Sequence, residues 1–94
     1  MRILLWGGRS KARIIIDMIK EIYGPSAEIS AIFDKTLNKL PFATDIKLYK
    51  ERADLDFVCE HCSHYIVCTG GEHGYLRYKI AKNLEERDLK PLSI

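Results

Sequence analysis

The residues ILLWGGRSKARIIID, from Ile3 to Asp17, decide the fold. They read as a buried strand, a glycine turn and the first turns of an amphipathic helix, which is how a nucleotide-binding βαβ unit opens. Three cations, Arg9, Lys11 and Arg13, fall where the helix begins, although the amide groups there already make a helix N-terminus electropositive. Each exposed cation costs about 0.3–1 kcal/mol at such a place unless an anion offsets it. The stretch therefore predicts an anion site for a phosphorylated ligand.

Length and composition indicate one ordinary globular domain. The 94 residues suffice for a single hydrophobic core, and a content of 47% hydrophobic and 30% charged residues excludes the disordered and collagen-like classes. The net charge of +2, without a broad basic face, gives no support to nucleic acid or a membrane surface as a partner. We therefore expect residues 1–94 to form one domain with a small-molecule ligand and with neither of those partners.

The N-terminus and the cysteines bear on location. The chain enters a strand at once, without the basic region and long apolar run of a secretory signal, and no stretch is long enough to cross a bilayer. Three cysteines are an odd number, which favours free thiols in a reducing compartment. The cytoplasm is therefore the expected location.

Apolar patterns divide the chain into strands and helices. The first helix, capped by Ser10, has apolar residues at i, i+3 and i+4 spacing and stops at Gly24 and Pro25. Its expected buried positions are Ala12, Ile15, Ile16, Ile19, Ile22 and Tyr23. Later helices are expected from Asp54 to Cys62 and from Tyr75 to Arg87, the last burying Leu76, Ile80, Ala81 and Leu84. Strands are expected at Arg2 to Trp6, Glu28 to Asp34, Leu40 to Phe42, Tyr65 to Thr69 and Leu92 to Ile94.

Strands that alternate with helices predict a parallel α/β sheet with right-handed crossovers and helices on both faces. The expected arrangement is Rossmann-like, with the strand order 3-2-1-4-5. In this order the first and fourth strands are neighbours where the winding reverses, so the Gly7-Gly8 turn and a second turn at Gly70-Gly71 face one crevice. Two separate glycine turns are thus expected to serve one ligand site.

The first glycine turn departs from two known phosphate-binding motifs. A G-x-G-x-x-G fingerprint that starts at Gly7 places Arg9 at the second glycine, the one that lets the backbone approach a pyrophosphate, and Ala12 at the third. The sequence G-x-x-x-x-G-K-[ST] does not occur either. A dehydrogenase fragment and a P-loop ATPase are therefore disfavoured. The plainer alternative is that Gly7 and Gly8 only form the turn and that the cations are solvated.

Further candidate contacts follow the second and fourth strands. Asp34 stands at the carboxyl end of the second strand, where an acidic residue can accept hydrogen bonds from a ribose, although it can equally cap the following turn. In the second glycine turn, His73 can donate to a phosphate or sugar oxygen, and Glu72 can accept from a sugar hydroxyl. Both can instead be solvated loop residues.

The segment CEHCSH, from Cys59 to His64, is a weaker candidate for a site. Thiolates and imidazoles are the ligands that zinc prefers, but a single C-x-x-C lacks the partner pair of a zinc site. At i, i+3 on a helix, the thiols of Cys59 and Cys62 can pack as small apolar groups, which is the interpretation that we favour. A thioredoxin-like redox pair is disfavoured, because such pairs sit at a helix start after a strand.

In these features the chain resembles the N-terminal domain of the bacterial sugar O- and N-acyltransferases, which include sialic-acid O-acetyltransferases and UDP-amino-sugar N-acetyltransferases (PglD-like). That family opens approximately G-x-G-G-H-[AG]-[KR]-V-V-x-D after an apolar strand, where this chain has GGRSKARIIID from Gly7 to Asp17. Here Arg9 and Ser10 stand in place of family glycines, and Lys11 stands in place of the histidine. The other matching residues are Phe33-Asp34, Gly70, Arg77 and the terminal Lys-Pro-Leu-Ser-Ile.

The resemblance implies a function and a set of contacts. In that family this domain holds the nucleotide-sugar acceptor, and a left-handed β-helix of hexapeptide repeats, expected outside this chain, binds acetyl-CoA and supplies the histidine base, usually in a homotrimer. The implied ligand is a UDP-sugar or a similar nucleotide-sugar of glycan biosynthesis, with no cofactor, metal or catalytic residue in this chain. The implied contacts are Gly7, Gly8, Arg9, Ser10, Lys11, Arg13, Asp34, Gly70, Gly71 and His73.

The sequence is also consistent with a function other than that of an acceptor-binding domain of an enzyme. The chain can be a non-catalytic nucleotide- or CoA-binding module that regulates a partner or assembles with it. Because no set of residues forms a nucleophile, a base and an orienting group, the sequence assigns no chemistry to this chain alone.

Overall fold

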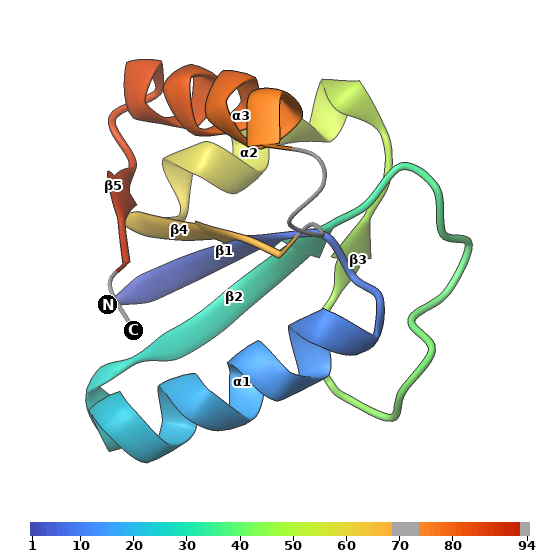
Figure 1. Cartoon of the computed structure of the whole chain (residues 1–94), viewed down its shortest axis with the longest axis vertical. Helices are drawn as coiled ribbons and strands as arrows, with labels where there is room; N and C mark the ends of the chain where they lie inside the picture. The colour runs from blue at the N-terminus through green and yellow to red at the C-terminus, as the bar shows by residue number, and fades with distance from the viewer. Residues whose placement is uncertain (69–73, 93–94) are drawn as a thin grey trace.

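Strands and helices alternate along the chain, as Figure 1 shows for the computed structural model, which describes residues 1–68 and 74–92. The strands are β1 (Arg2–Trp6), β2 (Glu28–Phe33), β3 (Leu48–Tyr49), β4 (His64–Val67) and β5 (Lys90–Pro91). The helices are α1 (Ser10–Tyr23), α2 (Leu55–Glu60) and α3 (Gly74–Glu86), with short 3-10 turns at Gly24–Ser26 and Arg52–Asp54.

Within the described residues, five parallel strands form one sheet in the order β3-β2-β1-β4-β5. This confirms the predicted α/β class and strand order. β1 is central, and its last residue, Trp6, lies level with Phe33 of β2 and with Val67 of β4. The carboxyl ends of these three strands therefore meet at one edge, where the winding reverses.

Helices cover both faces of the sheet, with α1 on one face and α2 and α3 on the other (Figure 1). Alternate residues of β1 serve the two cores: Ile3 and Leu5 pack with α1, whereas Leu4 packs on the opposite side. The α1 core also contains Ala12, Ile16, Ile19, Ile32 and Cys68. The opposite core also contains Ala31, Phe33, Leu55, Val58, Cys59, Tyr65, Ile80, Leu84 and Leu89. Burial on both faces explains the continuous apolar run of β1.

Helix α1 has no favourable cap at its N-terminus. Its stability therefore depends on the burial of one face. Arg9 occupies the N-cap position without a side-chain hydrogen bond, and Ser10 is already inside the helix, so the predicted Ser10 cap is wrong. The fully buried residues of the helix are Ala12, Ile16 and Ile19. Ile22, predicted to be buried, is 55% exposed because it lies on the flank of the helix. At the C-terminus, Gly24 has a φ of 58° and donates its amide to the Lys20 carbonyl, which confirms the predicted glycine stop.

The third strand lies later in the chain than predicted. The expected strand from Leu40 to Phe42 is wrong, because the segment that pairs with β2 is Leu48–Tyr49. Pro41 cannot donate to a strand ladder. The apolar signal around it has another cause, since Leu40 and Phe42 pack against the α1 core from a loop.

The last strand lies earlier than predicted. β5 is Lys90–Pro91, so it begins before the predicted start at Leu92. The rest of the predicted strand, residues 93–94, lies outside the described part of the chain. In α3, the residues buried as predicted are Ile80 and Leu84. Leu76 was expected to be buried as well, but it is 50% exposed and lines a cavity.

The remaining elements differ from prediction only at their ends. β2 stops at Phe33, one residue before Asp34. Helix α2, Leu55–Glu60, is shorter than the predicted helix from Asp54 to Cys62. Across residues 1–68 and 74–92, no helix has the length and apolar character that crossing a membrane requires.

Candidate functional site

The turn after β1 requires glycine at its first position. Gly7 has a φ of 114°, which L side chains rarely adopt, and it donates its amide to the Phe33 carbonyl at 2.8 Å. A Cβ on Gly7 would lie 3.3 Å from the Cys68 carbonyl oxygen. The turn therefore holds the start of α1 close to the carboxyl ends of β2 and β4.

Asp34 ties the glycine turn to the loop that follows β2. Its Oδ2 accepts the Gly8 amide at 3.0 Å, and its Oδ1 accepts the amide and the hydroxyl of Thr36 at 2.9 and 2.5 Å. Arg9 donates from Nη2 to the Thr36 hydroxyl oxygen at 3.1 Å. The turn-capping role of Asp34 is confirmed by these contacts, and its contact with a ribose stays a prediction.

The same contacts set the charge state of Asp34. Partial burial acts to raise the pKa of this carboxyl group, but the hydrogen bonds from Thr36 and Gly8, together with the Arg9 charge, outweigh it and hold the pKa below its usual value. Asp34 is consequently ionised at neutral pH. Its negative charge offsets part of the positive charge at the start of α1.

A cavity of about 440 Å³ opens above the carboxyl ends of β1 and β2. Its apolar wall includes Trp6 and Phe33, whose tilted rings have centroids 4.6 Å apart, and Leu76 and Ile80 of α3. Its polar lining consists of Arg9, Ser10, Lys11, Asp34, Lys35 and Thr36. An apolar, aromatic wall beside a basic rim suits a ligand that joins a planar or apolar group to a phosphate.

The cavity brings together only part of the predicted contact set. The predicted contacts that line it are Gly7, Arg9, Ser10, Lys11 and Asp34. Gly8 lies beneath the turn, where a Cβ would be 2.9 Å from Leu40 Cδ2. Arg13 borders an adjoining cavity of about 330 Å³, beside Pro41 and Phe42. Gly70, Gly71 and His73 lie outside the described residues.

The sequence patterns missed the apolar half of this site. They place Trp6 and Phe33 only in strands, and Leu76 and Ile80 only on the buried face of a helix. The available signal for Trp6 is its position, because the last side chain of a strand before a glycine turn lies at the ligand edge of a parallel sheet. No such signal exists for Leu76 and Ile80, since their placement depends on how α3 crosses the sheet.

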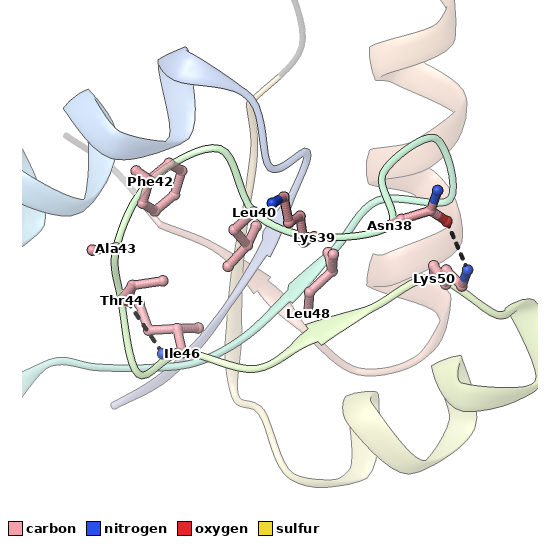
Figure 2. A pocket seen from close by; sticks show the side chains of 9 residues that line it. All are labelled: Asn38, Lys39, Leu40, Phe42, Ala43, Thr44, Ile46, Leu48 and Lys50. Atoms are coloured by element: carbon pink, nitrogen blue, oxygen red, sulfur yellow. Dashed lines mark hydrogen bonds between the residues drawn. The ribbon is translucent and has the colours of Figure 1, made fainter.

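A second cavity of about 440 Å³ lies inside the long loop between β2 and β3 (Figure 2). Leu40, Phe42 and Leu48 line it, and a 3.0 Å hydrogen bond from Lys50 Nζ to Asn38 Oδ1 spans one end. These apolar side chains also pack against the α1 core. We therefore interpret this cavity as a consequence of loop packing.

The three thiols are shielded to different degrees. Cys59 and Cys68 are buried, Cys62 is half-buried, and all are free. Burial raises the pKa of Cys62 to about 11 and that of Cys68 to about 12, although the charges of Lys11 and Arg77 act to lower the latter. Cys59 belongs to the core beneath α2 and α3, which confirms its packing role. In the described parts of the chain, no three histidine, cysteine or acidic side chains are grouped to hold a metal ion.

Comparisons of the chain with protein-family models, with curated proteins and with solved structures found no match. Its function is therefore argued from the geometry of the cavity above β1 and β2.

Proposed function

We propose that this chain binds a nucleotide-sugar in the cavity above β1 and β2 and serves as the acceptor-binding domain of a sugar acetyltransferase. One observation carries the proposal: the aromatic wall of Trp6 and Phe33 meets two cations from the start of α1, Arg9 and Lys11, in a single cavity. A nucleotide-sugar joins a planar base to a diphosphate and a polar sugar. Its parts match the two halves of this lining.

The diphosphate fits best at the start of α1. The amides of Arg9 and Ser10 donate to no acceptor among the described residues, as is usual for the first amides of a helix. Lys11 adds a charged donor at the same side of the cavity. Because the Gly8 amide already donates to Asp34, we assign the phosphate contacts to residues 9–11.

The base and the ribose are assigned to the apolar wall and to Asp34. Asp34 Oδ2 accepts one hydrogen bond from the protein, and a carboxylate oxygen can accept a second, which leaves capacity for a ribose hydroxyl. Acetyl-CoA binding, the catalytic base and the trimeric assembly implied by the family resemblance belong, in this proposal, to a domain outside this chain.

Isothermal titration calorimetry with UDP-sugars, NAD and CoA tests the proposal. The expected result is saturable binding of a UDP-sugar with a change in the fluorescence of Trp6, the single tryptophan of the chain, which lines the cavity. Saturable binding of NAD or CoA without a response to any nucleotide-sugar would contradict the proposal.

A pair of lysine variants locates the phosphate. Lys11→Ala should weaken binding about tenfold or more, since a charge-assisted hydrogen bond contributes roughly 1.5–3 kcal/mol and about 1.4 kcal/mol corresponds to tenfold. Lys20→Ala is the matched control, because Lys20 lies on the same helix but does not line this cavity. If the two variants bind the UDP-sugar with equal affinity, Lys11 does not contact the phosphate.

The second candidate is a non-catalytic nucleotide- or CoA-binding module that regulates a partner or assembles with it. Cys68, the thiol that lines the cavity, fits both candidates: burial raises its pKa to about 12, so the thiol stays protonated and is a poor nucleophile at neutral pH. The two candidates differ in their ligand. Binding of CoA or a free nucleotide that changes the affinity for a protein partner, with no binding of nucleotide-sugars, would favour the module.

A further inference from the structure

Helix α1 exposes a ridge of three large apolar side chains on its outer side. Ile14, Met18 and Ile22 are 60%, 38% and 55% exposed and follow one another at intervals of four residues. At 3.6 residues per turn, this spacing places them on one side of the helix, one above the other. Single exposed apolar residues are ordinary on protein surfaces, whereas three that adjoin form a surface on which another apolar face can pack.

The surface of α1 next to the ridge borders a groove. Ile15, beside the ridge on the helix surface, borders an open groove of about 630 Å³ together with Ile66 of β4 and Leu92. The other wall of this groove comes from α3, with Arg77, Tyr78 and Ala81. Of the described helices, only α1 lies on this face of the sheet, whereas α2 and α3 share the other (Figure 1).

We propose that α1 of a second copy of this chain packs against this ridge in an antiparallel, symmetric pair. The ridge has opposite charges at its two ends, because Lys11 lies one turn before Ile14 and Glu21 lies three residues after Met18, both of them exposed. When Ile14 packs against the partner's Met18, Lys11 faces the partner's Glu21, and the symmetry repeats both contacts. Both copies use the same surface in the contact. Neither copy then has this surface left for a third chain, so the assembly stops at a dimer.

The distribution of charge along α1 selects the antiparallel orientation. The helix starts with Arg9, Lys11 and Arg13 and has no acid in its first turn, whereas its second half carries two acids, Asp17 and Glu21, and one cation, Lys20. A parallel pair would bring the cationic starts together, and an antiparallel pair brings each start beside the acidic half of the other helix. Because α1 has 14 residues and is roughly 21 Å long, the contact is small, and we expect a dissociation constant in the micromolar range.

Sedimentation velocity over a wide range of concentrations, without added nucleotide, tests the dimer. The wild-type chain should dimerise with increasing concentration, and Met18→Glu should raise the dissociation constant at least tenfold, because it places a charge in the apolar contact. Tyr75→Glu is the matched control: Tyr75 lies on α3, is 78% exposed, and should leave the dimer unchanged. Circular dichroism establishes that each variant is folded.

A charge exchange tests the orientation of the two helices. Glu21→Lys alone should weaken the dimer about threefold, as expected for an exposed ion pair made twice, and K11E combined with E21K in one chain should restore it. The proposal is overturned by a wild-type chain that stays monomeric, by M18E and Y75E variants that behave alike, or by an exchange that does not restore the dimer. Occupation of the ridge only by a different protein would overturn it too.

Discussion

Replacing Asp34 by asparagine should destabilise the fold by about 1–3 kcal/mol at neutral pH. The carboxylate accepts the Gly8 amide on one oxygen and the amide and hydroxyl of Thr36 on the other. Asparagine has a single side-chain oxygen, so its NH2 group must face a donor at either Gly8 or Thr36. A partly buried donor left without an acceptor costs about 1–3 kcal/mol, which sets the expected loss.

Urea unfolding followed by Trp6 fluorescence measures this loss, because the Trp6 ring lies 4.6 Å from that of the buried Phe33. In a domain of this size 1 kcal/mol shifts the Tm by roughly 4–8 °C, so thermal unfolding gives an independent reading. Asp45→Asn is the control, since Asp45 is exposed in the same loop and its carboxylate has no hydrogen bond to the described residues. That variant should remain within about 0.5 kcal/mol of the wild type.

The dependence on pH gives a further test of the same contact. The folded-state pKa of Asp34 lies below its ordinary value of 3.8, so its contribution to stability is fully present above about pH 3.8 and is lost as the pH falls through the folded-state pKa. This part of the acid-induced loss should disappear in Asp34→Asn. If the Asp34 and Asp45 variants are equally stable, and the wild type and Asp34→Asn lose stability in parallel on acidification, Asp34 does not anchor the turn.

Two further predictions concern Gly8 and the thiols. Gly8→Ala should cost about 1–3 kcal/mol in urea unfolding, because its Cβ would lie 2.9 Å from Leu40 Cδ2 and 3.1 Å from Ile32 Cγ2. A loss below about 0.5 kcal/mol would refute the packing argument. In the folded protein at pH 8, Cys62 should react with iodoacetamide far more slowly than a free thiol, because its pKa is about 11. Labelling at the same rate with and without denaturant would contradict this.

The strand order could be predicted because it depends on local signals. Apolar runs alternate with amphipathic segments, and right-handed crossovers leave few possible orders. The position of β3 could not be predicted, since a strand of two residues carries almost no pattern, and the stronger apolar signal at Leu40 and Phe42 comes from a loop that packs on the α1 core. The pattern of apolar residues indicates which residues are buried. It does not distinguish a buried strand from a loop that packs on the same face of the sheet.

The sequence predicts only those residues of the candidate site that lie at the carboxyl ends of the strands. Gly7, Lys11 and Asp34 line one cavity because parallel strands present their carboxyl ends at the same edge. The hydrogen bond from the Gly8 amide to Asp34 joins two separate loops, and no spacing rule within either loop contains it. Because this contact occupies the Gly8 amide, the proposed phosphate contacts are limited to residues 9–11 of the predicted set, and only the three-dimensional arrangement indicates this.

Lys11 belongs to both proposals, and this gives a last prediction. It lines the cavity above β1 and β2, and it also borders the groove beside the apolar ridge of α1. A ligand phosphate and the partner's Glu21 would therefore compete for the same ammonium group. Saturating UDP-sugar should raise the dissociation constant of the dimer, and by linkage dimerisation should weaken binding of the UDP-sugar by the same factor. A dimer constant unchanged by bound UDP-sugar would mean that Lys11 serves only one of the two contacts, and Lys11→Ala would then identify which one, because it would weaken that contact alone.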